Sequence, residues 1–130
     1  MFLEGRKTVL TIWGEDEDPG VENLLKRLSA ELPDLDHVQL KHGPNLIESI
    51  RNIGPQLIVF DISGRIAHFS ETLQNLKQHF CSVPIFALVD KYSCELERKV
   101  LLLGISTVFS KESDEWSLIQ NIRAVLPSIN

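Results

Sequence analysis

Carboxylates and one lysine stand at the ends of apolar runs in this sequence, and these residues have the types that could carry chemistry. They are Glu15, Asp16, Glu17, Asp18, Asp61, Asp90 and Lys111. Asp61 is the clearest of them because four consecutive apolar residues, 57–60, precede it. A pocket that brings carboxylates together with a lysine suits Mg²⁺ and a phosphoryl group, since hard cations prefer oxygen ligands and an ammonium neutralises phosphoryl oxygens. We therefore expect an acidic pocket around Asp61.

Five apolar, β-rich runs alternate with segments of helical period, and this alternation is typical of parallel βα units. We expect strands at residues 8–13, 37–40, 57–60, 85–89 and 107–109. The sequence thus predicts an α/β fold, a doubly wound five-stranded parallel sheet in (βα)5 order. In such a sheet the functional crevice lies beyond the carboxyl ends of the strands. That edge would bring the acidic residues and Lys111 together.

The intervening helices carry recognisable end signals. Pro19 suits the first turn of the first helix, and the third helix is expected over about residues 70–80. The fourth helix should start near Ser93 and end at Gly104, and Ser113 is expected to cap the fifth.

Composition narrows the class of protein. The chain has 130 residues, enough for one well-packed core and too few for two ordinary domains, so we expect a single domain over residues 1–130. A net charge of −5 and a pI near 5.3 argue against a nucleic-acid or anionic-membrane surface. Cys81 and Cys94 lack metal-ligand spacing, and no apolar run reaches membrane-spanning length. We expect a soluble cytoplasmic protein.

Two stretches, LIVFD at residues 57–61 and TVFSK at 107–111, form a recognisable set with the acidic run. With them the sequence resembles, over essentially its whole length, the receiver domains of bacterial two-component response regulators, which have flavodoxin-like topology. The resemblance implies that Asp61 accepts a phosphoryl group and that Lys111 pairs with it. It also implies a bound Mg²⁺, held by Asp61, by one or more of the acids at residues 15–18, of which we select Asp16 and Glu17, and by the backbone carbonyl of Ser63. We expect the ion to bind weakly. No enzymatic activity is implied beyond self-phosphorylation at Asp61.

The sequence departs from the receiver pattern at positions that transmit the signal. Val89 stands where these domains have a serine or threonine at the end of the fourth strand, and Val108 stands where they have an aromatic residue on the fifth. Glu112 replaces the proline that normally follows the lysine. We therefore expect an atypical receiver with a weakened relay.

The resemblance also implies partners. A histidine kinase or a small phosphodonor would act upstream. A protein partner would bind the face formed by the fourth helix, fifth strand and fifth helix, around Glu95, Arg98 and Lys99. The chain would also be able to form a homodimer. Neither nucleic acid nor a membrane is expected to contact this domain.

Two other functions remain open at this stage. A pseudo-receiver would use the same fold as a phosphate-independent interaction module, which would suit the missing hydroxyl at Val89. The segment Asp61-Ile62-Ser63-Gly64 also resembles the phosphorylatable site of anti-sigma-factor antagonist (STAS) domains. Against that family, its later Asp-Ser-x-Gly is absent, and residues 37–53 supply an extra βα unit that the receiver topology requires.

Ordinary structural roles compete with these assignments. The acids at residues 15–18 would serve equally as a solvated turn, and Lys111 as an exposed surface lysine. We expect the Asp61 and Lys111 side chains to be partly exposed. Replacing Asp61 by asparagine should then change the free energy of unfolding little, since each charge interaction is worth on the order of 1 kcal/mol.

Overall fold

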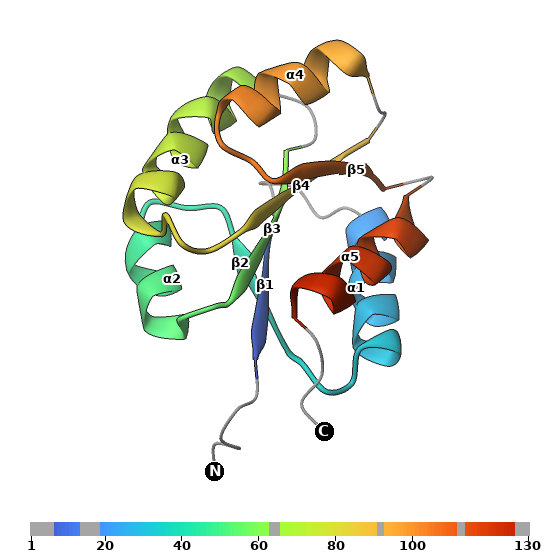
Figure 1. Ribbon diagram of the computed structural model, residues 1–130. Coiled ribbons are helices and arrows are strands. Elements are labelled where there is room, and N and C mark those ends of the chain that lie inside the picture. Colours follow the sequence, from blue (N-terminus) through green and yellow to red (C-terminus); the bar gives the residue numbers. More distant parts are fainter. Residues whose placement is uncertain (1–6, 14–18, 63–65, 91–92, 112–113, 127–130) are drawn as a thin grey trace.

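A parallel sheet with helices on both faces makes up the fold (Figure 1). The computed structural model describes residues 7–13, 19–62, 66–90, 93–111 and 114–126. Across these residues the strands are β1 (Thr8–Trp13), β2 (Asp36–Lys41), β3 (Leu57–Asp61), β4 (Ile85–Val89) and β5 (Thr107–Ser110). The helices are α1 (Pro19–Glu31), α2 (Leu46–Ile53), α3 (Ile66–His79), α4 (Cys94–Leu102) and α5 (Glu115–Val125). The predicted (βα)5 order and α/β fold class are confirmed.

The strand order is β2-β1-β3-β4-β5, and every pairing is parallel. The chain moves outward from β1 to β2, then returns past β1 to β3 and continues in the opposite direction. This reversal makes the carboxyl ends of β1 and β3 the topological switch point, where open α/β sheets bind ligands. The unit of β2 and α2 is the one that distinguishes receiver topology from STAS topology.

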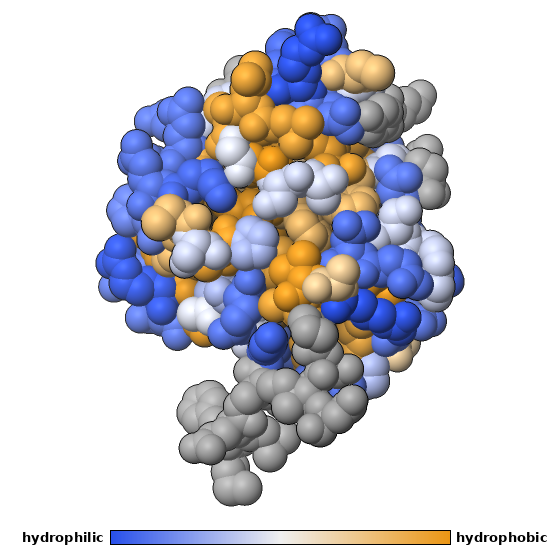
Figure 2. All heavy atoms as spheres, viewed as in Figure 1, coloured by the Kyte–Doolittle hydropathy of each residue, from blue (hydrophilic) through white to orange (hydrophobic). Residues whose placement is uncertain are grey.

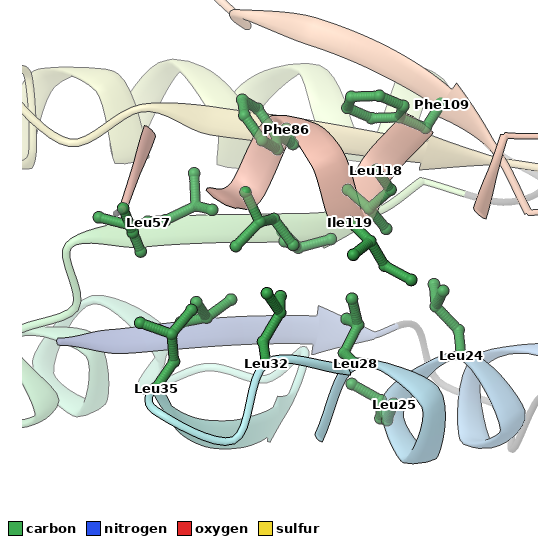
Figure 3. Close-up of a cluster of buried hydrophobic side chains, with 14 of the residues drawn as sticks. Leu24, Leu25, Leu28, Leu32, Leu35, Leu57, Phe86, Phe109, Leu118 and Ile119 are labelled. Atoms are coloured by element: carbon green, nitrogen blue, oxygen red, sulfur yellow. The ribbon is translucent and has the colours of Figure 1, made fainter. Parts of the chain in front are cut away.

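Two hydrophobic cores hold the layers together, one on each face of the sheet. Strands β3 and β4 are buried along their whole length, and alternate residues point into opposite cores. Figure 3 shows the core under α1 and α5, where Leu118 and Ile119 lie between Phe109 of the sheet and Leu28 of α1. Helices α2, α3 and α4 cover the other face (Figure 1). Because helices cover both faces of the sheet, the carboxyl edge is left as the place for a binding site.

Several element ends differ from the sequence predictions. Helix α3 begins at Ile66, about four residues earlier than expected, and β3 and β5 each run one residue further, to Asp61 and Ser110. The N-cap of α5 is Asp114, whereas Ser113 lies outside the described residues. The Asp114 carboxylate accepts a hydrogen bond from Ser110 N at 2.8 Å, so it ties the start of α5 to the end of β5.

Helix α4 starts next to Ser93, as predicted, and Ser93 is its N-cap. Its Oγ accepts a hydrogen bond from Leu96 N at 3.1 Å, which satisfies one of the free amides at the helix start. Helix α4 then ends at Leu102, two residues before Gly104, whose φ of 91° is in the left-handed region that favours glycine. None of the helices in the described ranges is long and apolar enough to cross a membrane.

Candidate functional site

Asp61 is the last residue of β3 and is buried at the carboxyl edge of the sheet. It lies in register with Leu88 of β4, and the next residue, Ile62, donates its amide to Leu88 O at 2.9 Å. The pairing of Ile12 with Phe60 brings the end of β1 to the same level. The sheet therefore carries the Asp61 carboxylate to the switch point between β1 and β3.

Lys111 follows β5 directly and reaches across β4 to Asp61. Its Nζ lies 2.8 Å from Asp61 Oδ1, and the two side chains are only 5% and 2% exposed. Its backbone amide donates to Val89 O at 2.9 Å, which fixes the start of the side chain at the end of β4. The structure thus brings together the two residues that sequence analysis selected. Their expected partial exposure is wrong, as is the alternative of an exposed surface lysine.

Burial changes the energetics of this pair. A charge removed from water loses several kcal/mol of solvation, and only a close partner of opposite charge offsets that loss. The 2.8 Å contact between Lys111 Nζ and Asp61 Oδ1 supplies such a partner. Loss of the Lys111 ammonium would therefore cost more free energy of unfolding than loss of a charge from an exposed ion pair.

Asp90 brings a second carboxylate to the same lysine. It is the first residue after β4, its Oδ1 lies 3.4 Å from Lys111 Nζ, and its side chain is 60% exposed. Lys111 therefore lies between a buried and an exposed carboxylate, contributed by the ends of β3 and β4. Asp90 is one of the strand-end acids expected from the sequence, but its contact with Lys111 was not predicted.

The two positions that depart from the receiver pattern are both buried. Val89 ends β4 and Val108 lies on β5, and both side chains pack in the core under α2, α3 and α4. A hydroxyl does occur nearby, at Ser110, the residue in register with Val89. It is buried, and its Oγ donates to Asp90 O at 3.3 Å. Ser110 was not predicted as a site residue, and its only signal in the sequence is its place immediately before Lys111.

The expected metal ligands are only partly described. Asp16, Glu17 and Ser63 lie outside the described residues, as does Glu112. Within the described ranges no group of three or more His, Cys, Asp or Glu residues is placed to hold a metal ion. The carboxylates in contact with Lys111 are hard oxygen donors and exceed it by one charge, a donor chemistry that fits Mg²⁺.

The surface of α4 combines charged and apolar side chains. Glu95, Arg98 and Lys99 are exposed, and Lys99 Nζ lies 3.4 Å from Glu95 Oε1. Leu102 at the end of the helix is 81% exposed. Figure 2 shows hydrophobic side chains gathered along the α4 end of the molecule next to hydrophilic ones. We call these four residues the α4 surface.

The other candidate residues show no arrangement for chemistry among the described parts of the chain. Cys81 and Cys94 are exposed free thiols. His42 packs edge-on against Phe60 and Phe69, and its Nε2 lies 3.2 Å from Thr72 Oγ1. These contacts are those of a packing histidine.

The similarity of this chain to known proteins is found in its structure. The sequence matches no family model, and no curated protein is significantly similar to it. A two-component response regulator of the LuxR family from an Aurantimonas species has a TM-score of 0.73 at 20% identity, over 94% of this chain and 86% of that one. The signal receiver domain of a DNA-binding response regulator from Colwellia psychrerythraea has a TM-score of 0.73 at 13% identity, over 92% and 97%.

A third solved structure shares the fold under a different description. It is a protein described as pilus assembly-related, from Burkholderia pseudomallei, with a TM-score of 0.73 at 12% identity over 100% of this chain and 97% of that one. Identities at this level show the fold alone. The strand order, the parallel pairing and these neighbours together show that the chain has the fold of response-regulator receiver domains.

Proposed function

We propose that this chain is a two-component receiver domain that accepts a phosphoryl group on Asp61 and acts through contacts with other proteins. The observation that carries the proposal is the buried ion pair between Asp61 and Lys111 at the carboxyl edge of the sheet. Burying two charges is costly. A carboxylate held beside a fixed ammonium at a topological switch point is an arrangement suited to phosphoryl transfer.

In this function an oxygen of the Asp61 carboxylate attacks the phosphorus of the donor. A new bond between that oxygen and phosphorus forms as the bond between phosphorus and the donor's leaving group breaks, which gives an acyl phosphate. The Lys111 ammonium, a compact point charge, stabilises the phosphoryl oxygens during the transfer. When bound, Mg²⁺ neutralises further charge, and Asp61, Asp16, Glu17 and the Ser63 carbonyl would hold it.

A second candidate function is a pseudo-receiver that binds partners without phosphorylation. The observation that favours it is the pair of buried valines, Val89 and Val108, at the positions that would read a phosphoryl group. Neither offers a hydroxyl or a ring. In both candidate functions the output is a protein contact.

For that contact we propose the α4 surface. An exposed leucine beside both signs of charge suits a protein partner, since large exposed apolar side chains mark interaction sites when they gather. The proposed setting is the cytoplasm, with a histidine kinase or a small phosphodonor upstream.

Intact-mass measurement after incubation with acetyl phosphate and Mg²⁺ tests phosphorylation. We expect the wild-type chain to gain the mass of one phosphoryl group and the Asp61→Asn variant to gain none. An unlabelled wild-type chain would contradict the first candidate and leave the pseudo-receiver. Labelling that persists in Asp61→Asn would assign the nucleophile to another residue, with Asp90 the first candidate.

A further inference from the structure

The backbone of Asp90 is fixed to the end of β5. Its carbonyl oxygen accepts a hydrogen bond from Ser110 Oγ at 3.3 Å, and the preceding carbonyl, that of Val89, accepts one from Lys111 N at 2.9 Å. Both contacts continue the register that pairs Val89 with Ser110. The Asp90 side chain therefore starts beside Lys111 and does not reach it by chance from a distant loop.

The two carboxylates on Lys111 differ in their access to solvent. Asp61 approaches Nζ to 2.8 Å and is 2% exposed, whereas Asp90 approaches to 3.4 Å and is 60% exposed. Asp61 thus lies on the protein side of the ammonium, and Asp90 reaches it from a position open to water. An anion that contacts Lys111 would therefore come close to the Asp90 charge, because the Asp90 carboxylate lies 3.4 Å from the same Nζ.

A lysine ammonium has three N–H donors and no acceptor, so every anion that contacts it competes for the same donors. A phosphoryl oxygen would need one of them. Because Asp90 is largely exposed, its carboxylate can leave Lys111 and be hydrated at little cost. Its contact with Lys111 is therefore one that a stronger anion can displace.

We propose that Asp90 is an internal anionic ligand of Lys111 that competes with phosphate-like anions for the Asp61 site and so determines which of them bind. The proposal rests on the proposed function of Asp61, because it concerns the same lysine. It adds a specificity-determining residue, one that weakens the binding of dianions more than that of monoanions, because the repulsion grows with their charge.

Titration with inorganic phosphate, followed through the amide chemical shifts of Asp61, Ser110 and Lys111, tests the role of Asp90. The Asp90→Asn variant keeps the shape of the side chain and removes its charge. We expect it to bind phosphate about fivefold more tightly than the wild-type chain. In 1 M salt, where the screening length is about 3 Å, the difference should shrink.

Glu95→Gln is the matched control because it removes the same charge from a nearby exposed position on α4. We expect its phosphate affinity to stay within about twofold of wild type. Asp90→Ser serves as a second variant, and thermal unfolding establishes that each variant is folded. Equal affinities in Asp90→Asn, Asp90→Ser and wild type would overturn the proposal. So would equal gains in Asp90→Asn and Glu95→Gln, or no response to phosphate in any of the chains.

Labelling with acetyl phosphate distinguishes a failure of the role of Asp90 from a failure of the proposed phosphorylation of Asp61. If neither wild type nor Asp90→Asn is labelled at Asp61 but the variant binds phosphate more tightly, phosphorylation fails and the role of Asp90 stands. If both are labelled at the same rate and bind phosphate equally, phosphorylation stands and the role of Asp90 fails.

Discussion

Replacing Lys111 by methionine keeps an unbranched aliphatic side chain and removes its ammonium. That ammonium lies 2.8 Å from Asp61 Oδ1, and both side chains are almost completely buried. At an effective dielectric constant of about 20, two unit charges at this separation attract each other by roughly 6 kcal/mol, most of which offsets their lost solvation. Without the ammonium the Asp61 carboxylate keeps its desolvation cost and loses the attraction. We expect Lys111→Met to lower the free energy of unfolding by about 3–5 kcal/mol.

Asp61→Asn removes the other charge of the same pair and should lower the free energy of unfolding much less. Lys111 keeps its contact with Asp90, 3.4 Å from Nζ, and the excess negative charge at the strand ends is relieved. We expect a change in the free energy of unfolding within about 1 kcal/mol. This agrees with the expectation from the sequence, although the reason is no longer partial exposure. We expect Lys111→Met to lose more free energy of unfolding than Asp61→Asn because Lys111 neutralises two carboxylates, those of Asp61 and Asp90.

Urea denaturation at neutral pH measures both effects, with Lys99→Met as the matched control. Lys99 pairs with Glu95 on the exposed face of α4, so its replacement should cost less than about 0.5 kcal/mol. For a chain of this length, 3 kcal/mol corresponds to a fall in Tm of about 10 °C. A cost for Lys111→Met similar to that of Lys99→Met would refute the reasoning. So would Asp61→Asn proving as destabilising as Lys111→Met.

Two further tests concern the stability that the N-cap of α4 provides and the amide shifts of α4 and α5 when a phosphoryl analogue binds at Asp61. Ser93→Ala removes the hydroxyl that accepts a hydrogen bond from Leu96 N and should lower the free energy of unfolding by about 1 kcal/mol in urea denaturation. Ser117→Ala, at an exposed position on α5, is the control, and equal stabilities of the two variants would contradict the cap. Beryllofluoride with Mg²⁺ should shift amides near Asp61 and Lys111 only, and broad shifts through residues 93–111 and 114–126 would instead indicate a conventional phosphorylation switch.

The central strands are predictable from sequence because burial on both faces leaves an uninterrupted apolar run. The predicted bounds of β4, Ile85–Val89, are those observed. The edge strand β2 is half-buried or exposed along its length and extends one residue beyond its prediction at each end. The start of α3 at Ile66 was missed because the apolar residues Ile66, Ala67 and Phe69 suit a helix, a strand or a loop.

The pairing of Asp61 with Lys111 is predictable because both follow strands whose carboxyl ends meet at one edge. Their burial is not, since it depends on how the surrounding chain packs over that edge. The contact of Asp90 depends on the register of β4 and β5, and a shift of one residue would turn its side chain to the other face. The roles of Asp16, Glu17 and Ser63 stay predictions.

A receiver fold is not by itself a switch, because a switch needs two packings that interact differently with the phosphoryl group. Val89 and Val108 are β-branched, stiff and enclosed in a core, so moving either would open a cavity without gaining a contact. Displacing a charge on the exposed side of the site costs less free energy than moving a buried side chain. A phosphoryl group that engages Lys111 displaces Asp90, and Asp90 begins the connection to Ser93, the N-cap of α4. A phosphoryl group on Asp61 would therefore act on the strand-end charges around Lys111 and Asp90 and would leave the packing of the core unchanged.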